Sequence, residues 1–267
     1  MRRHAQRAGK IRGSEMTRRL AVIAIAICLP LAAKLPKPEM PVITTESVEF
    51  APGGTIQVSG SMGVLNIEGW DRPEVEITVT RSTYRTDTPQ ARDLAKRQLS
   101  AIQVTAERKS STELAIHTAF PPRGFWARVA HRRPDVQLEY RIRVPRDSKL
   151  VLRHAGGDVM VYDVAGDIDA SVPTGDIVMQ LPAAGQYSFD ARCRFGDVYS
   201  DFAGNYHIAY LASERFVQPG PASAKRVYLR VRIGGIKIQK MAPATPLSGI
   251  APAAGEQRRP DRRVPHR

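Results

Sequence analysis

Apolar and polar residues alternate with a period of two along most of residues 42–240. In "GGTIQVSG", Ile56 and Val58 share one face, and in "EVEITVT" the three apolar residues alternate with Glu and Thr. This period is typical of half-buried strands, and the Gly-rich and Asp-Arg-Pro segments between them indicate turns. The pattern therefore predicts many short strands, each with one face in a core.

One segment, "TDTPQARDLAKRQLSAI", has a helical period instead. Thr88 is suited to be the N-cap and Pro89 to be the first helical residue. The apolar residues that fall at helical spacing are Ala91, Leu94, Ala95, Leu99 and Ile102. We expect one helix here, followed by the strand pair "IQVTAER" and "ELAIHTAF".

Gly-Asp followed by Val or Ile recurs in "GGDVMVYDVAGDIDASVPTGDIVMQLPAAG", at Gly157, Gly166 and Gly175. Glycine supplies a positive φ and Asp hydrogen-bonds to nearby backbone, so each unit predicts one short strand that ends in a turn. Repetition at a short fixed period is typical of stacked β architectures. We therefore predict an all-β, solenoid-like fold of stacked short strands, of β-helix or β-roll type, with one inserted α-helix.

The recurring aspartates have two interpretations. If two units make one coil, Asp158, Asp176 and Asp197 follow one another along one edge, with Asp167 on the opposite edge. They could instead be a row of metal ligands or catalytic acids. Glycoside hydrolysis needs two carboxylates that face one cleft, whereas these aspartates are placed in turns. The unit "GGDVMVYDV" also lacks the glycine pattern of calcium-binding β-rolls, so we favour a role in the turns.

The net charge of +14 is concentrated at the two ends of the chain. Residues 1–41 carry nine Lys and Arg against two Glu, and residues 241–267 carry five Arg against two acidic residues. This leaves +4 for residues 42–240, which argues against a nucleic-acid partner. The Pro- and Arg-rich stretch 241–267 has no periodicity, so we predict a disordered tail.

A signal sequence is predicted near the N-terminus. From Met16 the chain has a short positive region, an apolar run from Leu20 to Ala33 and then a Pro-rich polar stretch. That run is shorter than the roughly 20 residues that a membrane-spanning helix needs. We predict a signal sequence with a basic extension at 1–33, a linker at 34–46, and export to the periplasm or cell surface. The alternative is an uncleaved anchor, which would be the chain's contact with a membrane.

Residues with catalytic or metal-binding chemistry are scattered. Cys193 alternates with polar residues in "SFDARCRF", which indicates a buried strand position. No nucleophile elbow and no phosphate-binding loop occur. The histidines that lack metal-ligand spacing are His117, His131, His154 and His207. We therefore predict no catalytic residue, no cofactor site and no metal site.

The segment "RGFWARVAHRR" combines two aromatic residues, Phe125 and Trp126, with several arginines. This composition is found in loops that bind polyanions or glycans. The arginines are Arg123, Arg128, Arg132 and Arg133. We favour the alternative interpretation, in which the two aromatic side chains cover an edge of the core and the arginines lie in solvent.

Four features together resemble the putative-adhesin family of bacterial exported repeat proteins. They are "VEFAPGGTIQVSGSMGVLNIEGWDRPEVEITVT", "LEYRIRVPRDSKLVLRHAGGDVMV", the serial Gly-Asp units and the ending "VYLRVRIGGIKIQK". The likeness spans about residues 47–240. It implies an all-β, solenoid-like domain in a bacterial envelope protein, in a family largely of unknown function, and it implies no catalytic residue.

From these observations we expect a non-enzymatic exported envelope protein that acts as a structural or adhesin-like binding module. Its candidate partners are an envelope polysaccharide or another envelope protein, and no nucleic acid. The alternative is a carbohydrate-active β-helix enzyme that acts on polysaccharide.

The first prediction concerns export. The native mature protein should begin near Lys34, because the apolar run from Leu20 ends at Ala33. Intact-mass measurement of the protein purified from its own cells checks this. A cytoplasmic protein that retains Met1 or Met16 would contradict export.

Overall fold

The computed structural model describes residues 39–83, 88–121, 136–209 and 213–241. All of them belong to one compact unit that spans Pro38–Arg267. The expected signal sequence, the aromatic and Arg-rich segment and the tail after Met241 lie outside the described residues. Among the helices that are described, none is long and apolar enough to cross a membrane.

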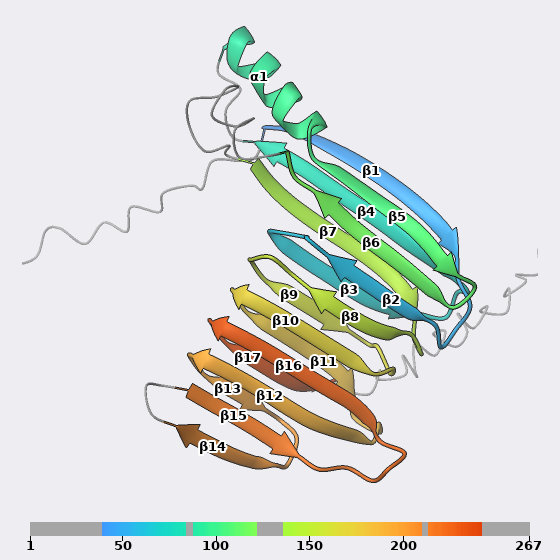
Figure 1. Cartoon of the computed structure of the whole chain (residues 1–267), viewed down its shortest axis with the longest axis vertical. Coiled ribbons are helices and arrows are strands. Elements are labelled where there is room, and N and C mark those ends of the chain that lie inside the picture. The colour runs from blue at the N-terminus through green and yellow to red at the C-terminus, as the bar shows by residue number, and fades with distance from the viewer. Residues whose placement is uncertain (1–38, 84–87, 122–135, 210–212, 242–267) are drawn as a thin grey trace, which may run out of the picture. The chain divides into compact units, whose positions relative to one another are not determined.

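The described residues form seventeen strands in two mixed sheets, with one helix, α1. The eight-stranded sheet has the spatial order β1 (Glu39–Glu49), β4 (Glu74–Thr83), β7 (Val136–Pro145), β3 (Val64–Trp70), β9 (Val159–Tyr162), β11 (Ile177–Pro182), β17 (Ile236–Met241) and β13 (Val198–Ser200). The nine-stranded sheet has the order β14 (Asn205–Ala209), β15 (Ser213–Gln218), β12 (Tyr187–Phe195), β16 (Lys225–Ile233), β10 (Ile168–Thr174), β8 (Lys149–Arg153), β2 (Thr55–Ser59), β6 (Glu113–Ala119) and β5 (Gln103–Ser110). Figure 1 shows the two sheets as two layers, one in front of the other. The all-β fold with one inserted helix is confirmed.

The core lies between the two sheets and follows the period of two in the sequence. In β11, Ile177, Met179 and Leu181 are buried, while Val178 and Gln180 are only partly so. The same alternation recurs in β2, β3 and β12. The inward residues of both sheets join one continuous apolar cluster. One face of each strand is therefore committed to the core and the other faces outward.

Six strands in each sheet pair in parallel, and each such strand of the nine-stranded sheet is followed in the chain by one of the eight-stranded sheet. These strand pairs do not stack in chain order. β17 lies between β11 and β13, and β16 lies between β10 and β12. The expectation that Asp158, Asp176 and Asp197 follow one another along one edge is therefore wrong for Asp197, because the turn before β17 separates it from Asp176.

Five glycines occupy the stacked turns between the sheets. They all have φ between +101° and +137°, a conformation that L side chains rarely adopt, and are Gly63, Gly157, Gly175, Gly234 and Gly196 in spatial order. A Cβ added to any of the last four would overlap the carbonyl oxygen of the glycine before it in this order. We call all five of these glycines the glycine column. Their close backbone approach explains why glycine recurs in the sequence.

The aspartates that follow these glycines link neighbouring turns. The carboxylate of Asp158 accepts a hydrogen bond from the N–H of Asp176 at 3.1 Å, and the carboxylate of Asp176 accepts one from the N–H of Gly235 at 2.6 Å. At the opposite edge, the carboxylate of Asp167 accepts one from the N–H of Arg226 at 2.9 Å. These bonds confirm the interpretation of Asp158, Asp176 and Asp167 as turn residues.

The sequence predicts the helix correctly but does not predict the first strand. α1 spans Pro89–Ser100, and the hydroxyl of Thr88 accepts a hydrogen bond from the N–H of Ala91 at 3.1 Å, as an N-cap does. Residues 39–46, which the sequence places in a linker, belong instead to β1, which pairs antiparallel with β4. β1 is an edge strand, and residues 41–47 are exposed, so it lacks the alternation that marks the other strands.

The glycine column predicts a sharp contrast between two adjacent glycines. Gly234→Ala should lower the free energy of unfolding by about 3 kcal/mol or more, because φ is +137° and the new methyl group would overlap the Gly175 carbonyl. At Gly235, an added Cβ meets its nearest atom at 3.4 Å, an ordinary contact, so Gly235→Ala should change stability by less than about 1 kcal/mol. Urea unfolding of both variants checks this. Equal destabilisation would mean that the close backbone stacking does not exist.

Candidate functional site

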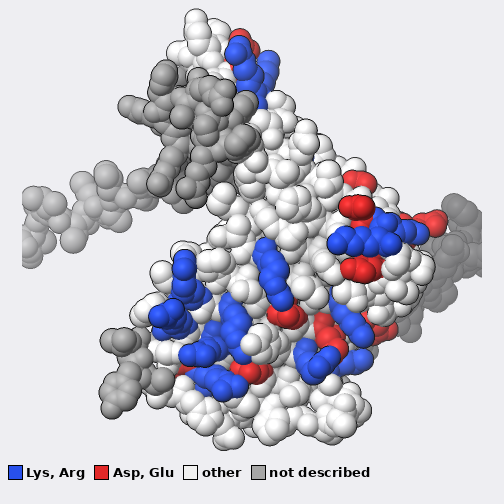
Figure 2. Space-filling model, in the orientation of Figure 1, with Lys and Arg blue, Asp and Glu red and all other residues white. Residues whose placement is uncertain are grey.

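The outward face of the nine-stranded sheet carries four arginines on two neighbouring parallel strands. Arg192 on β12 and Arg230 on β16 are register partners. Arg194 and Arg232 occupy the next outward positions of the same strands, between the partners Cys193–Val231 and Phe195–Ile233. We call Arg192, Arg194, Arg230 and Arg232 the arginine quartet. Figure 2 shows Lys and Arg side chains gathered over the part of this sheet that contains β12 and β16.

The arginine quartet lines a hollow of about 590 Å³, which we call the arginine hollow. The remaining residues of its lining carry no charge and are Ser171, Val172, Pro173 and Val231. Arg192, Arg194 and Arg232 are exposed, and no carboxylate of the described residues forms an ion pair with them. Positive charge at the hollow is therefore not neutralised locally.

Asp190 compensates part of the surrounding charge. It accepts hydrogen bonds from Arg215 on β15 at 2.8 and 3.0 Å, and from Arg230 at 3.2 and 3.3 Å. Burial alone would raise the pKa of Asp190, but the hydrogen bonds from Arg215 and Arg230, together with their charges, outweigh burial and lower it. Asp190 is therefore a fixed anion that holds two arginines.

Arg192 lies between those two arginines and shares neither of their bonds. Its register partners are Arg215 on β15 and Arg230 on β16. Like charges directly opposite on neighbouring strands destabilise a sheet. An anion bound in the arginine hollow would relieve this repulsion, and the guanidinium fork can bind a carboxylate, sulfate or phosphate group through two hydrogen bonds.

A second hollow adjoins the first on the same outward face. It has a volume of about 580 Å³, and we call it the tyrosine hollow because Tyr228 in its lining is 42% exposed. The guanidinium of Arg230 lies 3.4 Å from the centroid of the Tyr228 ring. Asp169 on β10 and Asp190 on β12 are the register partners of Tyr228. Asp169 is itself held by Arg153 at 2.7 and 3.0 Å.

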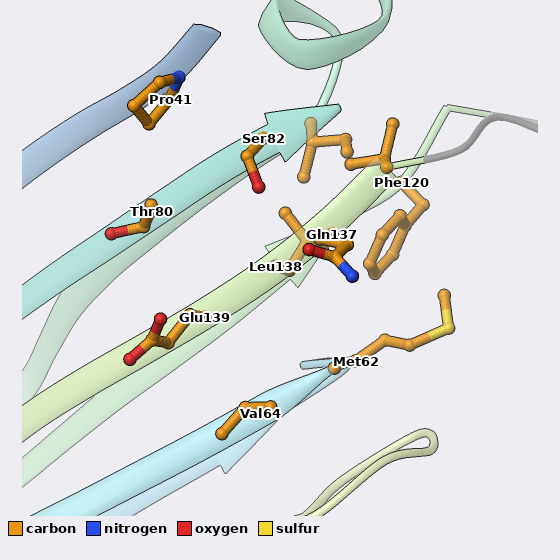
Figure 3. Close-up of a pocket in the computed structure, with 12 residues that line it drawn as sticks. Pro41, Met62, Val64, Thr80, Ser82, Phe120, Gln137, Leu138 and Glu139 are labelled. Carbon is orange, nitrogen blue, oxygen red and sulfur yellow. The ribbon is translucent and has the colours of Figure 1, made fainter. Parts of the chain in front are cut away.

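A third cavity, of about 460 Å³, lies on the eight-stranded sheet (Figure 3). Figure 3 shows Thr80 and Ser82 on β4 beside Gln137 and Glu139 on β7, with Met62 and Phe120 nearby. Its lining mixes apolar side chains with uncharged polar ones and one glutamate. It holds no concentration of charge, so its chemistry is less specific than that of the arginine hollow.

The residues singled out for chemistry from the sequence do not assemble into a site. Cys193 is buried, as expected, and burial raises the pKa of its thiol. His117 and His207 are exposed on different strands. Within the described residues, no group of three His, Cys, Asp or Glu side chains is arranged to hold a metal ion. His131 and the Phe125–Trp126 pair lie outside the described residues.

The arginine quartet itself was missed from the sequence, although half of its signal is visible there. "SFDARCRF" and "VYLRVRI" each alternate arginine with apolar residues, so each predicts outward arginines on one strand. Nothing in either stretch indicates that β16 inserts beside β12. The quartet depends on that long-range pairing.

His154 is buried in a hydrogen-bonded network between neighbouring turns. Its Nε2 donates to the carbonyl of Gly63 at 3.1 Å, and its Nδ1 accepts from the hydroxyl of Ser61 at 2.8 Å. A carbonyl only accepts, so Nε2 carries a proton, and in the neutral ring Nδ1 is then the acceptor from Ser61. Burial lowers the pKa of His154, against the smaller opposing effects of the Gly63 and Gly156 carbonyls and the Asp158 charge. We assign His154 a structural role.

Comparisons with known proteins give structural likenesses at low sequence identity. No protein-family model matches the chain, and the search of curated proteins finds no match. A "putative cell adhesion protein" from Clostridium sporogenes is 12% identical, with a TM-score of 0.45, and the match covers 76% of this chain and all of that one. A "putative adhesin" from Parabacteroides distasonis is 11% identical, with a TM-score of 0.24, over 74% of this chain and 79% of that one.

A further solved structure, a "putative lipid binding protein" from Parabacteroides distasonis, is 10% identical, with a TM-score of 0.23, over 75% of this chain and 97% of that one. The first two are named as adhesion proteins, as is the family that the sequence resembles. All three TM-scores lie below 0.5, so we draw nothing about function from these likenesses.

His154 predicts a pH dependence of stability. Its pKa is lower in the folded chain than the ordinary value of 6.5, so the unfolded chain takes up a proton first as the pH falls. The free energy of unfolding should therefore decrease below about pH 6.5, and decrease less steeply in His154→Gln. Urea unfolding at about pH 7.5 and about pH 5.5 checks this, with the exposed His117→Gln as control. An unchanged slope in His154→Gln would contradict the role of the buried ring.

Proposed function

We propose that the chain is a non-enzymatic, exported, adhesin-like binding module that holds an anionic partner in its arginine hollow. Residues 1–33 act as its signal sequence, residues 47–240 make a solenoid-like domain, joined at its start by β1, and residues 241–267 are a tail. The periplasm or the cell surface is its place of action. Parallel stacking of strand pairs in both sheets supports the solenoid-like description.

One observation carries this proposal: three arginines around a hollow have no carboxylate partner among the described residues, on a face that the fold leaves open. A protein can lower such repulsion with a neighbouring Asp or Glu, as Asp190 does for Arg215 and Arg230. Retaining Arg192, Arg194 and Arg232 unpaired disfavours the folded state. Residues that disfavour the folded state without a compensating contact are expected at functional sites.

The alternative, a carbohydrate-active enzyme, would be placed in the tyrosine hollow, where three aspartates occur. A glycosidase needs one carboxylic acid that is protonated near neutral pH, which requires a raised pKa. The pKa of Asp190 is lowered instead, and Asp169 is clamped by Arg153. Asp167 accepts a backbone hydrogen bond from Arg226, which is a structural role. This chemistry favours binding over hydrolysis.

The proposed function predicts that two exposed arginines control binding of a polyanion. Inorganic polyphosphate should bind the chain at low salt, and Arg192→Ser combined with Arg232→Ser should weaken its binding about tenfold or more, because charge-assisted hydrogen bonds are lost. Titration calorimetry checks this. The melting temperature of the variant should equal or exceed that of the parent, because repulsion between neighbouring arginines is removed.

The matched control is Arg141→Ser combined with Lys237→Ser, which removes two exposed positive charges from the eight-stranded sheet. It leaves the net charge equal to that of the arginine variant. Equal loss of polyphosphate binding in both variants would mean that net charge alone attracts the anion. That result, or a parent that does not bind, would contradict the arginine hollow as the binding site.

A further inference from the structure

The arginine hollow and the tyrosine hollow form one track along the strands. The outward residues of β12 are, in order, Ser188, Asp190, Arg192 and Arg194. The outward residues of β16 are Arg226, Tyr228, Arg230 and Arg232. Six residue steps at about 3.3 Å each separate the first and last position of either strand, so the track is about 20 Å long. It offers room for an extended ligand and not only for a single anion.

The two ends of this track have different chemistry. The arginine end presents guanidinium groups, which match carboxylates in planar, bidentate geometry. The tyrosine end presents an aromatic ring with Asp169 and Asp190 on either side. Each of these carboxylates is paired with arginine, and its remaining lone pairs can accept hydrogen bonds from hydroxyl groups. A suitable ligand therefore carries acidic groups at one position and uncharged, hydroxyl-rich groups at the next.

Resting on the proposed function, we propose that the anionic partner is a linear acidic polysaccharide in which carboxylate-bearing sugars alternate with uncharged ones. Its carboxylates bind Arg192, Arg194 and Arg232 in the arginine hollow. A neighbouring uncharged sugar packs its C–H groups on the Tyr228 ring, and its hydroxyls donate to Asp169 and Asp190.

The charges of the tyrosine hollow are close to balanced. Asp167, Asp169 and Asp190 line it together with Lys149 and Arg226, and all three carboxylates form ion pairs with arginines. The arginine hollow, by contrast, has three arginines without an ion-pair partner among the described residues. A ligand with acidic groups at one position and uncharged groups at the next matches this difference.

The test uses short hyaluronan oligosaccharides, in which acidic and uncharged sugars alternate, and the same oligosaccharides with methyl-esterified carboxylates. The parent should bind the acid form, and the ester should bind at least about tenfold more weakly because it lacks the charge that the arginine hollow recognises. Tyr228→Ala should weaken binding of the acid form about fivefold, while Tyr228→Phe should restore it, because the ring is the binding element. Tyr199→Ala, which removes an exposed ring from β13, is the matched control and should bind as the parent does.

Polyphosphate separates this inference from the proposed function. It has charge without sugar rings, so the parent should bind it through the arginine quartet whether or not hyaluronan binds, and the far-UV circular dichroism spectrum of Tyr228→Ala shows whether that variant is folded. If polyphosphate binds through the arginine quartet but hyaluronan does not bind, or binds equally well to Tyr228→Ala, the polysaccharide inference is wrong and the proposed function stands. If vesicles of phosphatidylglycerol bind more tightly than hyaluronan and this depends on the quartet, a membrane is the partner and the inference is likewise overturned. If neither anion binds, both proposals fail.

Discussion

The close approach of backbone at the glycine column is the constraint on which the rest of this structure depends. Each turn packs so tightly on the carbonyl of the turn before it that the last four glycines of the column have no room for a Cβ. The turns therefore fix the register of the parallel strands that follow them. Because Gly234 lies between Gly175 and Gly196 in this column, β17 inserts between β11 and β13, and β16 takes the corresponding place in the other sheet.

This insertion also creates the surface on which we propose that the ligand binds. The inward positions of β12 and β16 are committed to the core, where Ala191, Cys193, Leu229 and Val231 are buried. Side chains at the outward positions do not have to pack in the core, so charged residues can occupy them. Arg192 and Arg230 become direct neighbours only because β16 lies beside β12. The register that aligns β16 with β12 in the sheet also places the arginine quartet around one hollow.

Local physical chemistry made much of the fold predictable. The period of two identified the strands, and Thr88 and Pro89 identified the start of the helix, because these signals arise from neighbouring residues. The strand order was not predictable, since the chain between Asp197 and Gly234 contains no feature that indicates where β16 and β17 insert. The edge strand β1 was missed because it buries no face of its own at 41–47.

The candidate site was less predictable than the fold, for the same reason. The sequence drew attention to Asp158 and Asp176, which are local and repetitive and which the structure places in turn-to-turn hydrogen bonds. The quartet is non-local, since 38 positions separate Arg192 from its partner Arg230. Alternation of arginine with apolar residues in a strand predicts an outward charge. Whether that charge has a partner is decided by the neighbouring strand.

The most direct test of the central claim observes the arginine side chains themselves. NMR spectra of the Nε–H groups, assigned by substitution, can be recorded while hyaluronan oligosaccharide is added. The account predicts that the signals of Arg192, Arg194 and Arg232 shift in a saturable way, while that of Arg141, on β7 of the eight-stranded sheet, does not. Shifts spread evenly over both sheets, or none at the quartet, would contradict a binding site in the arginine hollow.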